Sequence, residues 1–175
     1  MIYQSSPSRL ETMNLPRIST LLLLSSCLLP AKEDDPLQEY TLFARFDDRG
    51  QVFINGNPIA KADRYKDLVE QKIWLRKGDI ITVKVEDTLG GIGGLLIRVV
   101  KGDRDIAGSK DFFYSVDPDP GWQTTDSMIK FKTSQLEKRK GVTLGNVAEP
   151  VGAWSKGEDK KFATAYFKCV FFPGF

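Results

Sequence analysis

The chain has 175 residues, enough for one domain of ordinary size, and its 41% hydrophobic and 27% charged residues are typical of a soluble globular protein. Its formal net charge of +2, from 25 basic and 23 acidic residues, gives no electrostatic case for binding nucleic acid. The absence of histidine excludes a Ser-His-Asp triad, a Cys-His pair and an imidazole general base, so the composition favours a binding protein over an enzyme.

The N-terminal segment has the pattern of a targeting sequence. A short basic region is followed by STLLLLSSCLLPA, an apolar run too short to span a bilayer, and then by acidic residues. We therefore predict a secretory signal peptide over residues 1–31. Within it, LSSC resembles a bacterial lipobox, in which Cys27 would carry lipid; cleavage after Ala31 is the alternative. Either form places the mature protein outside the cytoplasm, secreted, periplasmic or in the cell envelope, with membrane attachment only through a lipid anchor.

A pattern with a period of two residues runs from Glu39 onward and recurs between turn signals. The segments YTLFARF, DIITVKVE and LLIRVV each place apolar residues at every second position. Such alternation is typical of antiparallel sheets with one face on a core. We predict an all-β protein, an antiparallel β-sandwich over residues 37–126. Its expected core residues are Leu42, Phe46, Val52, Ile54, Ile81, Val83, Val85, Ile97 and Val99.

Two adjacent acids, Asp47 and Asp48, stand where the first predicted strand ends. Arg49-Gly50 allows a bend that would bring both carboxylates to one point, and such oxygen ligands suit calcium. The alternative is a turn in which the side chains accept hydrogen bonds from backbone amides. Glu86-Asp87 also follows a predicted strand and would add oxygens if it reached the same rim.

Two further segments invite a ligand interpretation. GGIGG lies between two predicted strands, so it lacks the following helix that a phosphate-binding loop needs. Trp122 follows Asp-Pro-Asp-Pro-Gly in a loop, where we predict an exposed ring able to stack on a sugar. Trp74 lies in a strand-like run, and we predict that it is buried.

The C-terminal part of the chain changes composition. Residues 127–147 are richer in Lys, Thr and Ser, and the strongly apolar stretch FATAYFKCVFF follows. We predict that residues 127–175 form a linker plus a closing strand, with the start of a truncated second domain as the alternative. Cys169, in this apolar stretch, is expected to be a buried and inert thiol.

The order FARFDDRGQVFINGNPI, IWLRKGDIITVKVEDTLGGIGGLLIRVV and FFYSVDPDPGWQ resembles galactose-binding-domain-like β-sandwiches. It is also similar to protective-antigen-like carbohydrate-binding domains, which like the former are appended to secreted bacterial glycosidases, esterases and adhesins. The resemblance covers about residues 37–123 and implies a jelly-roll sandwich. In sugar-binding members of the second group, a neighbouring aspartate pair holds a calcium that sugar hydroxyls also ligate. The positions matching that pair are Asp47 and Asp48.

From the residues and this resemblance we predict a non-catalytic carbohydrate-binding or adhesion module of a secreted or cell-surface bacterial protein. Its predicted ligand-binding residues are Asp47, Asp48, Asn55 and Trp122, with Asp47 and Asp48 also binding calcium. The alternative is a structural spacer domain of a larger secreted glycoside hydrolase or esterase, without a ligand of its own. A third hypothesis, a glycosidase using carboxylates alone, requires two acids facing each other across a cleft.

Overall fold

The computed structural model describes residues 35–65, 67–88, 94–155 and 163–173. The predicted signal peptide and Cys27 lie outside these residues. Across the described ranges the structure is built from β-strands, and the only helix is a short 3-10 turn, η1 (Ser109–Asp111). These ranges contain no helix with the length and hydrophobicity needed to cross a membrane.

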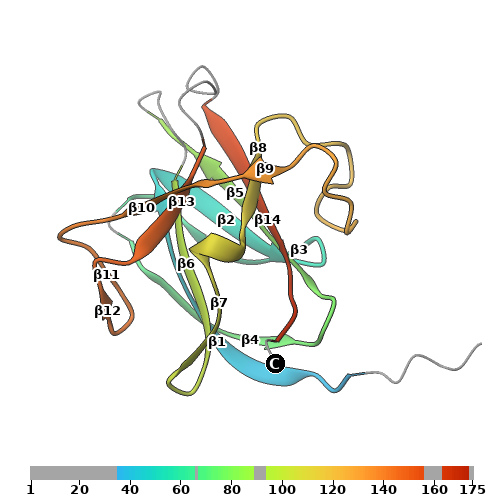
Figure 1. Ribbon diagram of the computed structural model, residues 1–175, viewed down its shortest axis with the longest axis horizontal. Coiled ribbons are helices and arrows are strands. Elements are labelled where there is room, and N and C mark those ends of the chain that lie inside the picture. Colours follow the sequence, from blue (N-terminus) through green and yellow to red (C-terminus); the bar gives the residue numbers. More distant parts are fainter. Residues whose placement is uncertain (1–34, 66, 89–93, 156–162, 174–175) are drawn as a thin grey trace, which may run out of the picture. The chain divides into compact units, whose positions relative to one another are not determined.

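The first sheet contains the long N-terminal strand and its neighbours, all antiparallel (Figure 1). The strand order is β10-β13-β6-β1-β4, with β7 paired to β6 outside this path. The bounds are β1 (Gln38–Asp47), β4 (Val69–Leu75), β6 (Gly94–Lys101), β7 (Arg104–Gly108), β10 (Gln135–Lys138) and β13 (Val151–Trp154).

The second sheet has the order β3-β2-β5-β14-β8-β9 and is also antiparallel. Its strands are β2 (Arg49–Ile54), β3 (Asn57–Ala62), β5 (Ile80–Glu86), β8 (Phe113–Ser115), β9 (Lys132–Thr133) and β14 (Thr164–Val170). A separate small hairpin joins β11 (Thr143–Leu144) to β12 (Val147–Ala148). The prediction of an all-β antiparallel sandwich is confirmed, whereas its jelly-roll, galactose-binding-like detail stays a prediction.

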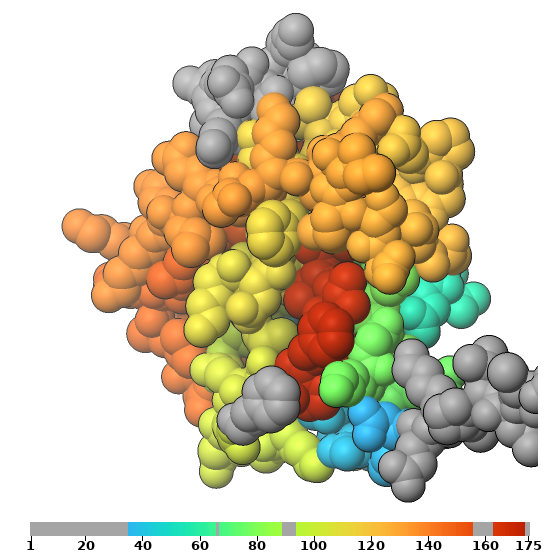
Figure 2. Space-filling view, turned by 45° about the vertical axis from the view of Figure 1, so that its right-hand side comes forward, coloured from blue at the N-terminus to red at the C-terminus, as the bar shows by residue number. Residues whose placement is uncertain are grey.

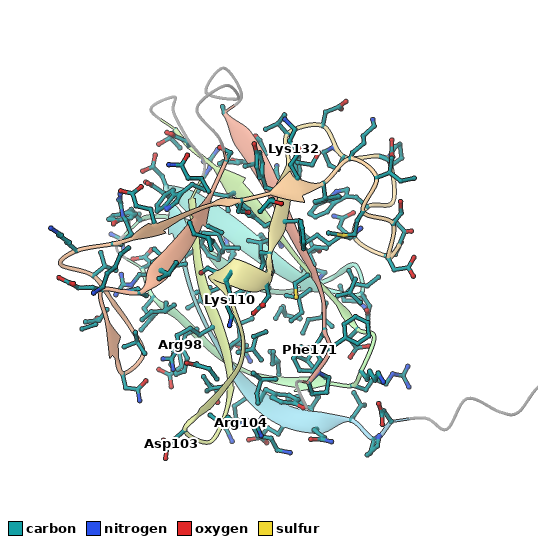
Figure 3. The ribbon with its side chains drawn as sticks, viewed as in Figure 1. Arg98, Asp103, Arg104, Lys110, Lys132 and Phe171 are labelled. Atoms are coloured by element: carbon teal, nitrogen blue, oxygen red, sulfur yellow. The ribbon has the colours of Figure 1, made fainter. Side chains whose placement is uncertain are left out.

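Period-two alternation builds the core as expected. In β1, Tyr40, Leu42, Ala44 and Phe46 are at most 3% exposed, while the residues between them are not fully buried. Every predicted core residue lies in the core, with Ile54 partly buried against it. Phe171, just after β14, also enters this core (Figure 3), where its ring centroid lies 5.2 Å from that of Tyr40.

The C-terminal strand β14 lies inside the second sheet, between β5 and β8. Beyond it the backbone of Phe171 exchanges hydrogen bonds with the β4–β5 turn at Gly78 and Asp79. Figure 2 shows this red segment next to the green turn. β14 is therefore paired on both of its edges. The thiol of Cys169 is buried as predicted, and burial raises its pKa to about 12, so the thiol is unreactive at neutral pH.

The segment predicted as a linker instead adds strands to both sheets and covers the outer face of β6. As a result β6 is buried on both faces, including Arg98, whose Nη1 donates to the Leu144 carbonyl at 3.0 Å. Trp154 packs directly on the backbone where β6 begins. A Cβ on Gly94 would lie 1.5 Å from the Trp154 ring, so only glycine fits there. Arg98 lies on β6, and Asp103 and Arg104 mark the tip of the β6–β7 hairpin (Figure 3).

Candidate functional site

Asp48 is a turn acid. Its Oδ2 accepts hydrogen bonds from the Thr88 backbone N–H at 2.9 Å and from the Thr88 hydroxyl at 2.5 Å. These two bonds favour the charged form and lower the pKa of Asp48. The carboxylate therefore links the end of β1 to the segment that follows β5. This is the turn role that the sequence offers as the alternative to calcium binding.

Asp47 faces a different partner. Its Oδ2 lies 3.7 Å from Nη2 of Arg139, whose guanidinium is 4.7 Å from the Trp154 ring centroid and donates to the Tyr65 hydroxyl at 3.2 Å. Burial is the main cause of the raised pKa of Asp47; Arg139 lowers it, and the nearby charges of Asp48 and Asp87 raise it. Asp47 is thus a partly buried acid that a fixed arginine only partly compensates.

The residues around this pair do not fit a calcium site. One oxygen of Asp48 is held by Thr88, and Arg139 already supplies a positive charge at Asp47. Glu86 is turned toward Arg49 and Lys84. Among the described residues, no group of three acidic or cysteine side chains could hold a metal ion. Calcium binding therefore stays a prediction from the sequence, without support from this geometry.

The prediction that Trp122 is exposed is wrong. The residue is 9% exposed, and its ring lies 5.1 Å from Tyr166, 6.3 Å from Phe131 and 6.4 Å from Phe53 between centroids. Because the loop after β8 turns back over the outer face of the second sheet, Trp122 anchors that loop instead of standing out from it. It offers no open face for a sugar ring.

The prediction that Trp74 is buried is also wrong, since the side chain is 55% exposed. Trp74 lies in the edge strand β4, where its neighbours Ile73 and Leu75 point into the core. The apolar run Ile-Trp-Leu hides this alternation, because all three residues are hydrophobic while only two of them face inward.

A hollow of about 370 Å³ lies between β4 and the β2–β3 hairpin, and Trp74 forms part of its wall. Apolar side chains from both sheets supply part of the lining. The polar part consists of amides and one ammonium group. The lining residues are Ile54, Asn55, Asn57, Ile59, Gln71, Lys72, Ile73 and Trp74.

Asn55, a predicted ligand-binding residue, is held firmly in this wall. Its Oδ1 accepts from the Ile80 N–H at 2.8 Å, and its Nδ2 donates to Asp79 at 2.9 Å. Its φ of 49° places it in the left-handed region that Asn tolerates in tight turns. Asn55 therefore has a structural role in the turn, and each amide atom keeps capacity for one further hydrogen bond.

The remaining polar groups of the hollow were not identified from the sequence. Lys72 donates to Glu39 at 2.9 Å, which is the main cause of its raised pKa, so it is a permanent cation at neutral pH. Asn57 and Gln71 are exposed. The sequence does place Lys72 and Trp74 on one face of a predicted strand, but no nearby residue shows that this strand lies at the edge of a sheet.

Another hollow, of about 410 Å³, lies between η1 and the β10–β13 pair. Lys110, labelled in Figure 3, is on its η1 side. Leu136, Val147, Pro150 and Val151 line the opposite side, and no aromatic ring contributes to it. This hollow lacks the stacking face that distinguishes the one at Trp74.

Asp47 and Asp48 thus lie at one rim, Asn55 lies in the Trp74 hollow, and Trp122 is buried where the loop after β8 packs on the second sheet; the structure does not bring the four predicted residues into one site. Comparisons with protein-family models, with curated proteins and with solved structures found no match for this chain.

Proposed function

We propose that this protein is a non-catalytic carbohydrate-binding module and that its site is the Trp74 hollow. The observation that carries the proposal is a tryptophan that is 55% exposed in the wall of a hollow, next to the amide side chains of Asn55, Asn57 and Gln71. An exposed tryptophan ring on a concave surface lined by amides is typical of a ligand-binding site.

The chemistry of the hollow matches that of a sugar. A pyranose ring has an apolar C–H face, which an indole can cover, and a rim of hydroxyls, which amides can bind as both donors and acceptors. Lys72 adds a donor and a positive charge. The predicted signal peptide and the resemblance to galactose-binding-like and protective-antigen-like domains agree with an extracellular glycan as ligand.

We assign no catalytic role to the carboxylates at the rim. Asp48 accepts a hydrogen bond from Thr88 and Asp47 faces Arg139, so both acids have structural partners in the fold. Acid and base catalysis of glycoside cleavage requires two carboxyl groups on opposite sides of a bound sugar. We therefore propose that the protein binds glycans without hydrolysing them, and chromogenic glycosides should remain intact in its presence.

A glycan array with the exported protein tests the proposal. Wild type is expected to bind a subset of glycans, and Trp74→Ala should lose that binding because the stacking face is gone. Phe113→Ala is the matched control: Phe113 is 42% exposed but lies on β8, outside the hollow, so binding should be unchanged. Thermal melts of both variants confirm that loss of signal is not loss of fold.

An array on which folded wild-type protein binds nothing would overturn the proposal and favour the structural spacer. Binding that survives Trp74→Ala but disappears with Phe113→Ala would overturn the choice of site and not the activity.

A further inference from the structure

We propose that the free edge of β4 pairs with β4 of a second copy of this chain, forming a two-fold symmetric dimer with a sheet continuous across both copies. Within the described part of the chain, β4 pairs only with β1 and ends the first sheet. Glu70, Gln71 and Lys72 are all exposed. An open strand edge of this kind is a template for pairing with another strand.

The sequence of β4 selects one register. In an antiparallel pair centred on Gln71, Glu70 of each copy lies directly opposite Lys72 of the other copy. Trp74 then lies opposite Leu68, the residue just before β4. Leu68 is 40% exposed and Trp74 55% exposed, so the ends of the pair bring together two apolar side chains that water now contacts.

Other registers are penalised. Moving the centre by one residue puts Lys72 opposite Lys72, or Glu70 opposite Glu70, and like charges directly opposite destabilise a strand pair. If one strand slips by a single residue, the centre moves by half a residue. The outer face of one sheet then lies beside the inner face of the other, which would expose core residues. Among these registers only the one centred on Gln71 is self-complementary, which is the property that a two-fold interface requires.

The charges are available for this role. Among the described residues Glu70 has no cationic partner, and Lys72 already contacts Glu39 across the outer face of the sheet. In the dimer, Lys72 of one copy would lie between Glu39 of its own chain and Glu70 of the other copy. Each dimer would contain two such clusters, related by the symmetry axis.

The dimer also involves the proposed glycan site, because Gln71, Lys72 and Trp74 line the hollow that opens at this edge. A second copy and a glycan therefore compete for the same edge. The proposal does not rest on the glycan site: self-association is measured without sugar and glycan binding at low protein concentration, so either can fail alone.

Sedimentation equilibrium of the exported protein tests the dimer. A seven-residue strand pair is smaller than a standard interface of about 1,600 Å², so association is expected between about 10 µM and about 1 mM. Glu70→Lys and Lys72→Glu should each weaken it by about tenfold or more, because each replaces two opposite-charge pairs with two like-charge pairs.

The most discriminating measurement uses an equimolar mixture of the two single variants. Glu70→Lys carries two lysines and Lys72→Glu carries two glutamates at these positions, so the mixture should form heterodimers with wild-type affinity. The double variant Glu70→Lys/Lys72→Glu should dimerise again by itself. Glu70→Gln and Lys72→Gln, which remove the attraction without repulsion, should give intermediate weakening and serve if a charge-reversed variant fails to fold.

Wild-type protein that stays monomeric up to about 1 mM overturns the proposal. Dimers that persist unchanged in both charge-reversed variants, or a mixture of the two that does not associate better than each alone, overturn it as well.

Discussion

Truncating Trp122 tests whether the loop after β8 is fastened to the second sheet as the structure shows. The ring is 9% exposed and makes edge contacts with Tyr166 and Phe53. Trp122→Ala removes this ring and leaves a gap beneath the loop. If the loop instead projected into solvent, as its Pro- and Gly-rich sequence suggested, the same substitution would have little effect on the free energy of unfolding.

The size of the effect follows from burial. A buried tryptophan removes roughly 200 Å² from water, which at about 25 cal/mol per Å² is about 5 kcal/mol. A compact unfolded chain reduces this to about 3–4 kcal/mol, within the ~3–5 kcal/mol typical of such truncations. For a domain of this size, that loss lowers Tm by about 6–16 °C. Trp74→Ala removes a side chain that is 55% exposed and should cost about 1–2 kcal/mol.

Urea unfolding followed by circular dichroism measures both variants under one set of conditions. The expected order of stability is wild type, then Trp74→Ala, then Trp122→Ala, with Trp122→Phe between the last two. A Trp122→Ala protein within about 1 kcal/mol of wild type, or less affected than Trp74→Ala, would refute the account of the loop.

Three further predictions concern single positions. Burial lowers the pKa of Lys168, so the native state binds fewer protons than the unfolded state between that lowered pKa and 10.5; stability should rise with pH through this window, and urea midpoints should show that Lys168→Met lacks the rise. Because burial raises the pKa of Asp47 and so disfavours its charged form, Asp47→Asn should increase Tm at neutral pH. Melts of wild type and of this variant in calcium and in chelator also test the calcium prediction. That prediction requires calcium to raise the Tm of wild type and not that of Asp47→Asn. Val83→Asp places an unpaired charge at a fully buried position and should abolish the β-sheet dichroism spectrum, and a native-like melt would contradict the core assignment.

Strand positions and most of the core could be predicted because alternation is a local property. Leu42, Phe46 and Val83 are buried as their spacing indicates. The double burial of β6 could not be read in the same way. Leu96 and Arg98 occupy positions that would be solvated in a two-layer sandwich, yet both are buried, and Arg98 bonds to Leu144, which is far away in the sequence.

The candidate site was harder to predict, for a related reason. Whether Trp74 or Trp122 is exposed depends on which strand lies at a sheet edge and on the direction in which a loop folds back, and neither is encoded within a few residues. Asp48 and Asn55 carry polar oxygens that suit a ligand, and the turns themselves use these oxygens. Turn residues and ligand residues share the same side-chain chemistry, so composition alone does not separate them.

The proposed function requires that a glycan binds against Trp74. The protein has three tryptophans, and each gives one indole N–H resonance that a Trp→Phe substitution assigns. Titration with a glycan selected on the array, followed by NMR at low protein concentration, should shift the Trp74 resonance in a saturable way. The resonances of Trp122 and Trp154, both buried, should stay in place. A saturating glycan that leaves the Trp74 resonance unmoved would contradict binding at this site.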